Sequence, residues 1–538
     1  MRVESTILLM VLYFCCVLGG KLSPLPPMGW MSWERFRCET DCSQSPNACI
    51  DENLYRNMTL RLKHDGFVAA GYNIISIDDC WMADERDING QQVANETRFP
   101  SGMKALGDYM HEHDVRFGLY TDEGEKTCGG YPGSKGYEET DAAMYASWGV
   151  DYLKVDGCYN DEEGFEVGYP SFGAALQNVG RNITYSCSWP AYLGDDETTK
   201  PFSDFAAAGC DLWRNWNDVD NSFASIVTIT DHWGDYSEVL QENAGPGFGW
   251  NDPDMVLAGD DHYGSAPNNL RLSLDQAKFQ LSIWSIVAAP LIMSNDLRTL
   301  PDCYRDLLLN PEMIAIDQDT LGSPGGRIGN KATTEVWGRT LFGGAIAVAM
   351  INKAGQGELS DECTWNVTAG SYLDAGEAGN IECSSWASLK KLRETCCSDD
   401  ECKTFSAFNG AFDTSGMYGC TRNKLAVSPS TGSVTVNSQY DGWTKMKRGS
   451  KPEQDNDTND GDDNDHEDND DNYNSDASVT VVFTDIAQYL GISAFTSATV
   501  RDIWARADLG NFSDGTFTAD VPSTGAVLLR IVPLDSTY

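Results

Sequence analysis

Positively charged residues are scarce in this chain of 538 residues: Lys and Arg number 38 against 81 Asp and Glu, which gives a formal net charge of −43 at pH 7. This balance argues against a nucleic-acid-binding protein, because the phosphates of DNA or RNA would be repelled. It suits a protein that is secreted, or that works in an acidic compartment, and that acts on neutral substrates.

Histidine is also rare, with six residues in the whole chain. None of them has the spacing of a metal-ligand pair at the end of a predicted strand, and His111 and His113 would lie on different faces of one helix. A metal-dependent hydrolase therefore lacks support. We expect neither a metal ion nor another cofactor.

Long apolar runs are lacking after the first 20 residues, so we expect no membrane-spanning helix. Residues 1–20 themselves have the three parts of a signal peptide: Arg2 near the start, an apolar core from Ile7 to Val17, and Gly19-Gly20 as a small-residue exit. We therefore predict entry into the secretory pathway, with a lysosomal or extracellular destination.

Cysteine, in contrast, is frequent, with 17 residues. Cys15 and Cys16 would leave with the signal peptide, and most of the others should pair in an oxidising compartment. Acceptor sequences for N-linked glycans fit the same destination; they start at Asn57, Asn95, Asn182, Asn366, Asn456 and Asn511.

Short apolar runs alternate with amphipathic segments between Pro26 and about Asp319. The predicted strands are Tyr72–Asp78, Arg116–Tyr120, Val150–Asp156, Ile183–Cys187 and Asp211–Arg214, and the predicted helices are Glu52–Ala69, Gly102–Glu112 and Ala142–Trp148. Strands that alternate with helices form parallel βαβ units, and this many units favour a closed (β/α)₈ barrel over an open sheet. We assign residues 21–325 to this barrel.

Polar and aromatic residues follow the predicted strands, which is where a barrel places its active site. They are Trp30 and Trp33; Asp78, Asp79 and Trp81; Tyr120 and Asp122; Lys154 and Asp156; Arg214 and Asp218; and Asp252 and Asp254. One such group could be explained by helix caps and ion pairs. The recurrence after several strands favours a functional site.

The composition changes from about Glu335. Residues 326–359 and 478–538 are rich in β-branched residues, glycine and turn signals, which predicts an antiparallel β domain in two pieces. Residues 360–451 separate the pieces and hold six cysteines, so we predict a disulfide-rich insert. Residues 452–477 are mostly Asp, Asn, Glu and Gly and are predicted to be a disordered linker, with loose Ca²⁺ binding as the alternative.

The most informative strand is Val150–Asp156. A strand that is buried on both faces tolerates few charges, yet this one holds Asp151, Lys154 and Asp156. Lys154 and Asp156 are two residues apart and therefore lie on the same face. A cation there would keep Asp156 ionised, which suits a carboxylate nucleophile. The alternative is a carboxylate at a strand end in a structural ion pair.

A second carboxylate, Asp218, follows the strand Asp211–Arg214 in a later unit of the barrel. Two acids on different strand ends can face each other across the mouth of a barrel. Glycoside hydrolysis needs such a pair, one ionised nucleophile and one protonated acid. Tyr120 and Tyr192 would suit the apolar faces of a sugar ring. The alternative for Asp218 is a helix N-cap or an ion pair with Arg214.

The motifs around these residues resemble one family of glycoside hydrolases, that of animal lysosomal α-galactosidase A and α-N-acetylgalactosaminidase. The matching segments are Pro27 to Trp30, Trp33 to Phe36, Ile77 to Trp81, Gly118 to Tyr120, Tyr152 to Cys158, Trp213 to Asn215, Gly249 to Met255, Ala289 to Leu291, Met293 to Asp296 and Asn310 to Leu321. The resemblance covers nearly all of residues 24–325. It implies an α/β fold, a (β/α)₈ TIM barrel followed by an antiparallel β-sandwich domain, which here carries a cysteine-rich insert.

The resemblance also implies roles for individual residues. Asp156 would be the nucleophile and Asp218 the general acid/base of a retaining exo-glycosidase that works by double displacement. The substrate-binding residues would be Trp33, Asp78, Asp79, Tyr120, Cys128, Lys154, Cys158, Ser188, Ala191, Tyr192, Arg214, Asp254 and Met255. The disulfides of the family would join Cys38 to Cys80, Cys42 to Cys49, Cys128 to Cys158, and Cys187 to Cys210.

Ser188 and Ala191 bear on which sugar is removed. In the α-galactosidases of the family, a Glu that binds the 2-hydroxyl takes the place of Ser188, and a Leu takes that of Ala191. The smaller residues leave room for a 2-acetamido group. In this respect the chain resembles the branch of the family that removes terminal α-linked N-acetylgalactosamine from glycoconjugates. The alternatives are an α-galactosidase or an enzyme with both activities. A more remote alternative is an inactive carbohydrate-binding or adhesive protein.

The insert departs from the family, whose β domain is uninterrupted. Segments of it are similar to a PAN/apple-type module, which binds protein or carbohydrate; they are Cys396-Cys397, Cys402, Phe405 to Phe408, Gly419-Cys420 and Asp441 to Trp443. A protein or glycan ligand of the insert and a homodimer are the further partners that these resemblances imply. The alternative is that the insert is a disulfide-bonded module that binds no ligand.

Overall fold

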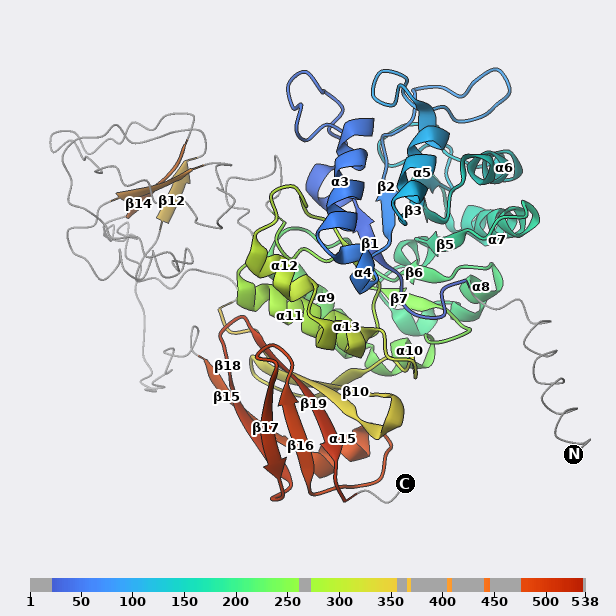
Figure 1. Ribbon diagram of the computed structural model, residues 1–538. Coiled ribbons are helices and arrows are strands. Elements are labelled where there is room, and N and C mark those ends of the chain that lie inside the picture. Colours follow the sequence, from blue (N-terminus) through green and yellow to red (C-terminus); the bar gives the residue numbers. More distant parts are fainter. Residues whose placement is uncertain are drawn as a thin grey trace, which may run out of the picture.

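The structure is a computed structural model that describes residues 22–260, 272–355, 365–368, 404–408, 440–445 and 476–535. Two bodies make up most of them, a barrel and a β-sandwich (Figure 1). The larger hydrophobic core fills the barrel and continues into its contact with the sandwich, and a smaller core lies between the two sheets of the sandwich. The predicted signal peptide lies outside the described residues.

Eight parallel strands form the barrel. They are β1 (Met28–Met31), β2 (Ile74–Ile77), β3 (Arg116–Asp122), β4 (Tyr152–Asp156), β5 (Thr184–Cys187), β6 (Leu212–Arg214), β7 (Trp250–Asp252) and β8 (Leu291–Met293). Their order in the sheet follows the sequence, and β1 pairs with both β2 and β8. The ring closes between β7 and β8, where Val256 forms a parallel bridge with Met293. The predicted (β/α)₈ barrel is therefore confirmed.

Helices cover the outside of the barrel (Figure 1). They are α2 (Trp33–Phe36), α3 (Glu52–His64), α4 (Phe67–Ala70), α5 (Gly102–Glu112), α6 (Glu138–Trp148), α7 (Glu162–Asn178), α8 (Phe202–Ala207), α9 (Phe223–Asp235), α10 (Ser237–Glu242), α11 (Leu274–Ile286), α12 (Asp302–Leu308) and α13 (Pro311–Asp317), with the 3₁₀ turns η1 (Trp189–Tyr192) and η2 (Glu197–Thr199). The predicted helix Gly102–Glu112 is α5. The predicted helix Glu52–Ala69 is two helices, because Gly66 adopts a φ of 93° between them.

The sandwich consists of two antiparallel sheets. The larger contains β9 (Gly326–Lys331), β10 (Thr334–Thr340), β11 (Ile346–Asn352), β16 (Ala498–Asp502), β17 (Ala507–Phe512) and β19 (Ala526–Pro533), and the smaller pairs β15 (Ala477–Val482) with β18 (Thr516–Val521). Alternate residues of β15, Val479 and Val481, enter the core between the sheets. The predicted antiparallel β-sandwich is confirmed.

One helix interrupts the second stretch for which the sequence predicts β structure. It is α15 (Phe483–Tyr489), which follows β15 directly. Phe483, Ile486 and Ala487 are buried, and their spacing of three and four residues is that of one face of a helix. No helix was predicted within this β domain, because the β-branched residues on both sides outweigh a helical pattern of two turns.

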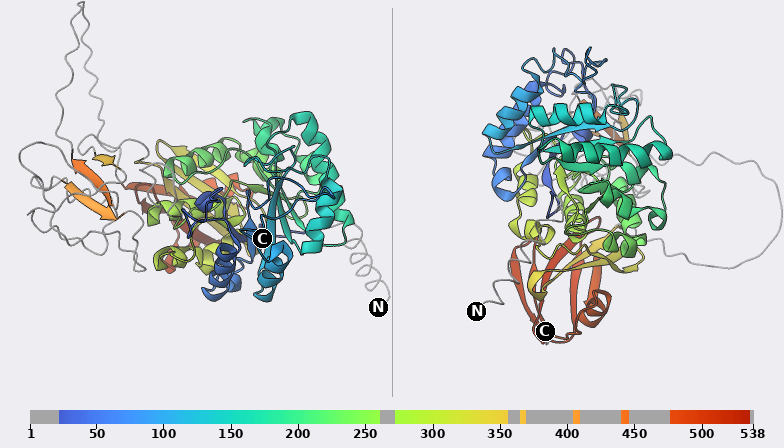
Figure 2. Two further views of the ribbon diagram at one scale, coloured as in Figure 1. Left: turned by 90° about the horizontal axis from the view of Figure 1, so that it is seen from above. Right: turned by 90° about the vertical axis from the view of Figure 1, so that its right-hand side faces the viewer.

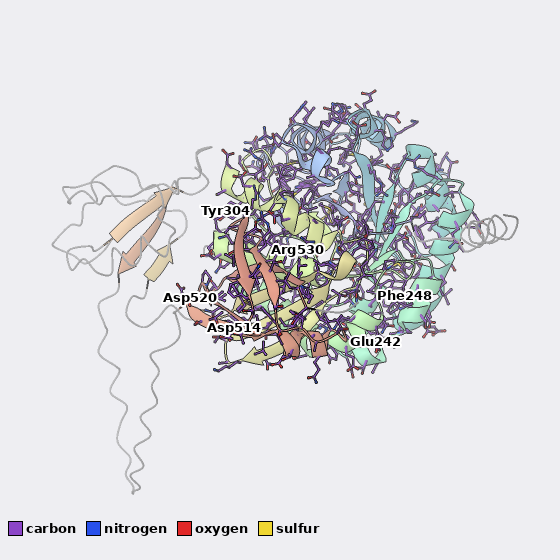
Figure 3. All side chains as sticks on the ribbon, turned by 60° about the horizontal axis from the view of Figure 1, so that its bottom comes forward. Glu242, Phe248, Tyr304, Asp514, Asp520 and Arg530 are labelled. Carbon is purple, nitrogen blue, oxygen red and sulfur yellow. A yellow bond between two sulfur atoms is a disulfide. The ribbon has the colours of Figure 1, made fainter. Side chains whose placement is uncertain are left out.

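The sandwich packs against helices of the barrel (Figures 2 and 3). Helix α11 contacts β10, β11 and β19, and α9 and α10 contact β9. Arg339 of β10 is fully buried at this contact and donates hydrogen bonds to the carbonyl oxygens of Ser285 at 2.8 Å and Ile316 at 2.7 Å. Arg501 of β16 donates to the carboxylate of Glu312 in α13 at 2.5 and 2.7 Å. Each arginine therefore ties a sandwich strand to the outer helices of the barrel.

The segment between β11 and β15 leaves and re-enters the sandwich at one place. Ser523 donates its hydroxyl to the carbonyl of Ala354 at 3.0 Å and its N–H to the carboxylate of Asp476 at 3.0 Å. Between these points, β12 (Trp365–Thr368), β14 (Tyr440–Lys445) and β13 (Thr404–Phe408) form an antiparallel sheet in that order. The cysteines of the insert and residues 452–475 of the predicted acidic linker, with its Ca²⁺ alternative, lie outside the described residues, and Ala477, the last residue of that prediction, begins β15. Among the helices that the structure describes, none combines the length and apolar character needed to cross a bilayer.

Candidate active site

The residues predicted to form the site lie near the carboxyl ends of the barrel strands. Trp33 follows β1; Asp78 and Asp79 follow β2; Tyr120 lies in β3; Lys154 and Asp156 end β4; Ser188, Ala191 and Tyr192 follow β5; Arg214 ends β6 and Asp218 follows it; Asp254 and Met255 follow β7; and Cys128 and Cys158 lie after β3 and β4. Because the strands are parallel, these ends share one face of the barrel. The active sites of such barrels form on that face.

Three hydrogen bonds hold the carboxylate of Asp156. The Tyr192 hydroxyl donates to Oδ1 at 2.7 Å, the Gly157 N–H donates to the same oxygen at 3.0 Å, and the Tyr120 hydroxyl donates to Oδ2 at 3.3 Å. A Cβ at Gly157 would lie 2.8 Å from the Tyr192 ring, so this close approach requires glycine. Burial and the charge of Asp156 raise the pKa of both tyrosines, which therefore stay protonated and remain donors.

Lys154 places a buried positive charge beside Asp156. Its Nζ donates to Asp78 Oδ2 at 3.0 Å and lies 5.2 Å from the centroid of the Tyr120 ring. Burial alone would lower the pKa of Lys154, but the charges of Asp78 and Asp156 outweigh it and raise the pKa. The ammonium therefore stays charged. The sequence left open that the carboxylate at the end of this strand only forms a structural ion pair. Lys154 does form an ion pair, but its partner is Asp78.

Asp218 forms an ion pair with Arg214, which also binds Asp254. Arg214 Nη2 lies 2.9 Å from Asp218 Oδ1 and 3.1 Å from Asp254 Oδ2. The side chain of Arg214 is 6% exposed, whereas that of Asp218 is 70% exposed. Enclosure by the surrounding protein opposes ionisation of Asp218, but the charges of Arg214 and Lys154 outweigh it and lower the pKa. Water can therefore reach the carboxylate of Asp218, which forms its ion pair with the buried cation of Arg214.

The backbone beside Asp218 is fixed by the same network. Asp254 Oδ2 accepts the N–H of Val219 at 2.9 Å. The ion pair of Asp218 with Arg214 is one of the two alternatives that the sequence left open. The other is wrong, because Ser222 is the residue that caps α9.

Two further carboxylates sit side by side after β2. Asp79 accepts the N–H groups of Cys80 and Gly129, each at 2.6 Å, and burial raises the pKa of Asp79 to about 6. The N–H of Asp79 in turn donates to Asp78 Oδ1 at 2.8 Å. Both side chains are buried at the mouth of the barrel with their oxygens fixed by backbone donors.

Four disulfides are present in the described residues: Cys38–Cys80, Cys42–Cys49, Cys128–Cys158 and Cys187–Cys210. They are the pairs that the family resemblance implies. The bridge from Cys128 to Cys158 joins the segments that follow β3 and β4, two residues past Asp156. Its Cys158 Sγ lies 3.4 Å from the Tyr192 hydroxyl, so the bridge and Tyr192 meet beside the carboxylate.

Ser188 and Ala191 belong to one turn after β5. Ser188 is buried, Ala191 is half-buried, and the N–H of Ala191 donates to the Ser188 carbonyl at 3.1 Å. The next residue, Tyr192, reaches Asp156 as described above. The two small side chains are therefore held in a fixed relation to that carboxylate.

Backbone strain also occurs at the same face. Four residues other than glycine have left-handed φ values just past barrel strands: Arg37 (46°) after β1, Cys80 (72°) after β2, Tyr159 (53°) after β4 and Asp254 (84°) after β7. Such conformations cost on the order of 1–3 kcal/mol each and persist where the surroundings impose them, as at functional sites.

Asp122 was noted among the polar residues after the predicted strands but was given no role, and Arg37 was not singled out; both contact this face. Asp122 pairs with Asp156 in the register of β3 and β4, and its carboxylate accepts the N–H groups of Gly124 at 2.7 Å and Cys158 at 3.0 Å. Burial and then the charge of Asp156 raise the pKa of Asp122 to about 9. Alternation along β3 could have identified it, since Tyr120 and Asp122 share a face.

Four buried carboxyl groups make the stability of the protein depend on pH. Burial is the main reason that the pKa is raised to about 9 for Asp122 and Glu123 and to about 8 for Glu34 and Asp317. The folded protein keeps protons that the unfolded chain releases near pH 4, so stability from these groups is full below about pH 4 and is lost as the pH rises toward 8 to 9. We expect the melting temperature at pH 5 to exceed that at pH 8 by roughly 5 °C or more.

This expectation can be checked by calorimetry on the protein and its variants. Glu123→Gln with Asp317→Asn removes two of the titrating groups and should shrink the difference between pH 5 and pH 8, whereas Glu96→Gln, at an exposed position, should not. Carboxylates with lowered pKa values, such as Glu312 beside Arg501, act in another window, because they lose their contribution only as the pH falls below about 4.5. A melting temperature that rises from pH 5 to pH 8 would contradict the assignment.

Comparison with known proteins agrees with the fold. The family described as alpha galactosidase A matches residues 25–319, and the alpha galactosidase C-terminal beta sandwich domain matches residues 469–531. Alpha-galactosidase A of Homo sapiens is 42% identical over 367 residues, which cover 68% of this chain and 82% of that protein. Alpha-N-acetylgalactosaminidase of Gallus gallus is 44% identical over 340 residues, which cover 62% and 81%.

A solved structure shows the same fold. Alpha-galactosidase I from Mortierella vinacea superposes with a TM-score of 0.65 at 22% identity, over 97% of this chain and 100% of that one. The barrel, its carboxylates and these relatives define a glycoside hydrolase. The chain belongs to the family of alpha-galactosidase A and alpha-N-acetylgalactosaminidase, whose barrel segment spans more than half of it.

Proposed function

We propose that the protein is a retaining exo-glycosidase that removes terminal α-linked N-acetylgalactosamine from glycoconjugates. The observation that supports this most is the contrast between its two carboxylates. Asp156 is held by hydroxyl and N–H donors beside the buried Lys154, whereas Asp218 is exposed beside Arg214. The first is suited to attack a fixed carbon, and the second to exchange protons with a leaving group and with water.

In the first step, Asp156 attacks the anomeric carbon of the terminal sugar. The bond to the leaving oxygen breaks, Asp218 donates its proton to that oxygen, and the sugar remains as an ester on Asp156. No water enters between the carboxylates at this stage, because in retaining enzymes they lie only about 5–5.5 Å apart. The positive charge that develops on the sugar ring faces the surrounding carboxylates of the barrel mouth.

In the second step, water replaces the leaving group. Asp218, now ionised, takes a proton from the water, which attacks the anomeric carbon and breaks the ester, so the sugar leaves with its α configuration and Asp156 is regenerated. Because Arg214 and Lys154 lower the pKa of Asp218, the protonated form that the first step needs is common only in acid. We therefore expect the activity to be highest on the acid side of neutrality.

The remaining residues would bind the sugar. We propose that Asp78 and Asp79, with Lys154, bind its outer hydroxyls, and that Trp33 and Met255 form apolar walls. Ser188 would donate to the 2-acetamido group and Ala191 would contact its methyl. The rest of the site would be formed by Tyr120, Tyr192, Arg214, Asp254 and the bridge between Cys128 and Cys158.

An α-galactosidase is the second candidate, alone or as a second activity. It is favoured by the comparable identity to alpha-galactosidase A, and a site with room for the acetamido group also admits the smaller galactoside. An inactive carbohydrate-binding or adhesive protein is more remote. The intact network of Asp156, Lys154, Arg214 and Asp218 speaks against it, since a protein without turnover would have no need of it.

Hydrolysis of p-nitrophenyl α-N-acetylgalactosaminide and p-nitrophenyl α-galactoside by the purified protein tests the proposal. We expect both to be cleaved, the first with the larger kcat/KM, and more rapidly at pH 5 than at pH 8. Preference for the galactoside would favour the second candidate. Cleavage of neither would favour the inactive protein.

We also propose that the protein is secreted or lysosomal, forms a homodimer, and carries a protein or glycan ligand on its insert. Four disulfides support the oxidising compartment. The glycan acceptor sites Asn57, Asn182 and Asn511 are exposed, as a glycan requires.

A further inference from the structure

Arg37 stands at the mouth of the barrel, in a conformation that its surroundings impose. It follows β1 and α2, its φ is 46°, and its N–H donates to the carbonyl of Trp33 at 2.8 Å. The N–H groups of Glu34 and Arg35 donate to the Ser294 hydroxyl, just past β8, at 2.9 and 3.2 Å. The segment that bears Arg37 is therefore fastened to the carboxyl ends of two neighbouring strands.

The guanidinium of Arg37 lies over an aromatic ring, and the side chain remains partly exposed. Its Cζ is 5.4 Å from the centroid of the Trp33 ring, and its NH2 group pairs with the carboxyl of Glu34. The side chain is 37% exposed. A guanidinium has five N–H donors in one plane, so stacking on a ring and pairing with one carboxyl leave an edge of the fork for a ligand that approaches from solvent.

Three cations act on Asp218, and they differ in exposure. Arg214 and Lys154 are buried, with 6% and 8% of their side chains exposed, against 37% for Arg37. The charge of Arg37 also lowers the pKa of Asp218, and the guanidinium lies over the ring of Trp33, one of the proposed walls of the sugar site. Of these three cations, Arg37 is therefore the one that a group attached to the leaving oxygen can contact.

We propose that Arg37 selects the leaving group, and that it favours an aglycone bearing an oxyanion, a carboxylate or a sulfate, next to the sugar that is removed. Arginine binds such groups through two parallel N–H bonds. The chain as a whole, with a net charge of −43, repels an acidic glycoconjugate. The exposed charge of Arg37 at the mouth offsets this repulsion where the substrate must dock.

The partner of Arg37 leaves this charge available in acid. Glu34 is buried, and burial is the main cause that raises its pKa to about 8, against the effect of Arg37 and with that of Asp260 and Asp254. Below that pH the Glu34 carboxyl is protonated. The guanidinium then accepts an anionic ligand without first giving up a full ion pair.

The test compares two α-N-acetylgalactosaminides with the same leaving phenol, one carrying a neutral carbamoylmethyl group and one a carboxymethyl group. A sulfomethyl analogue stands in for sulfate and shows which oxyanion is preferred. For Arg37→Gln we expect the ratio of kcat/KM, anionic over neutral, to fall about tenfold from that of the parent, the worth of one charge-assisted hydrogen bond. Arg37→Lys should keep part of the ratio, because it keeps the charge and loses the fork.

Lys63→Gln is the matched control. Lys63 is 36% exposed and pairs with Asp114 at 2.6 Å, just before β3 and therefore at the opposite end of the barrel. The Lys63→Gln substitution also removes one positive charge, and it should leave the ratio of kcat/KM, anionic over neutral, unchanged. Added salt should lower the ratio of the parent toward that of Arg37→Gln, which tests the proposal without a variant.

The inference rests on the proposed function, and the two can fail separately. If the parent cleaves the neutral glycoside and Arg37→Gln lowers kcat/KM for both substrates by the same factor, Arg37 is only structural and the proposed function stands. If the parent cleaves no glycoside of the series, the proposed function fails and the role of Arg37 fails with it.

Discussion

Replacing Asp156 with Asn is expected to abolish turnover and to leave the fold intact. Asn has nearly the shape of Asp, so the Tyr192 hydroxyl and the Gly157 N–H can still donate to its Oδ1. Its amide is neutral and a poor nucleophile, so no ester forms with the anomeric carbon. We expect kcat to fall on the order of 10⁴-fold or more.

The measurement is kcat on p-nitrophenyl α-N-acetylgalactosaminide, or on the galactoside if the parent prefers it, together with the melting temperature. Asp161→Asn is the matched control, because the same substitution five positions later keeps a helix cap: Asp161 accepts the Gly164 N–H at 2.9 Å, and Asn caps a helix as well as Asp does. Turnover by Asp156→Asn at the rate of the parent would remove Asp156 as the nucleophile.

The sequence can single out Asp156 because the surrounding pattern makes a charge conspicuous. Tyr152, Leu153 and Val155 of β4 are buried, as the apolar run predicts, and a charge in such a strand needs a reason. Alternation then places Lys154 and Asp156 on one face without any knowledge of the fold. The parallel arrangement of the predicted strands brings their ends to one face of the barrel, so the class of site could be predicted as well.

Two of the very short strands could not be predicted in the same way. β7 and β8 have three residues each, too few to show a period, whereas β6, also of three residues, lies within the predicted strand Asp211–Arg214. Their existence depends on neighbours in the barrel, such as the pairing of Trp213 with Asn251 between β6 and β7. The helix α15 was missed for a related reason, since two turns within a β-branched stretch give a weak signal.

The partners of the site residues also depend on the closed fold. Lys154 binds Asp78 across 76 positions of sequence, and Arg214 binds both Asp218, four positions away, and Asp254. Local pattern shows that acids outnumber cations at the strand ends. It does not show which acid each cation binds, and that choice decides which carboxylate is buried in an ion pair and which stays open to water.

Exchanging Ser188 for Glu together with Ala191 for Leu is expected to move the preference from N-acetylgalactosaminides to galactosides. Ser188 is the N-cap residue of the turn η1 and Ala191 lies within that turn. In the proposed site, larger side chains at these two positions would take up the space that the acetamido group needs. Glu would also accept a hydrogen bond from the 2-hydroxyl of galactose and would be left unpaired by the acetamido sugar. We expect the ratio of kcat/KM, N-acetylgalactosaminide over galactoside, to fall roughly 10²-fold.

A matched control is available on the next helix. Ser203 and Ala206 of α8 have the same spacing, and Ser203→Glu with Ala206→Leu makes the same chemical change at an exposed and a half-buried position outside the site. That variant should keep the ratio of the parent. A similar loss of both activities in the two variants would indicate damage to the fold and would be seen as a lowered melting temperature.

The single substitutions separate the two effects that the pair combines. Ala191→Leu adds bulk alone, so it should lower kcat/KM for the acetamido sugar and change that for the galactoside little, whereas Ser188→Glu should also raise kcat/KM for the galactoside. Because the Ala191 N–H bonds to the Ser188 carbonyl, the two sites are too close for their effects simply to add. An unchanged ratio in the double variant would show that the acetamido group does not lie against η1, and the choice of sugar would lose its basis while the choice of Asp156 as nucleophile would stand.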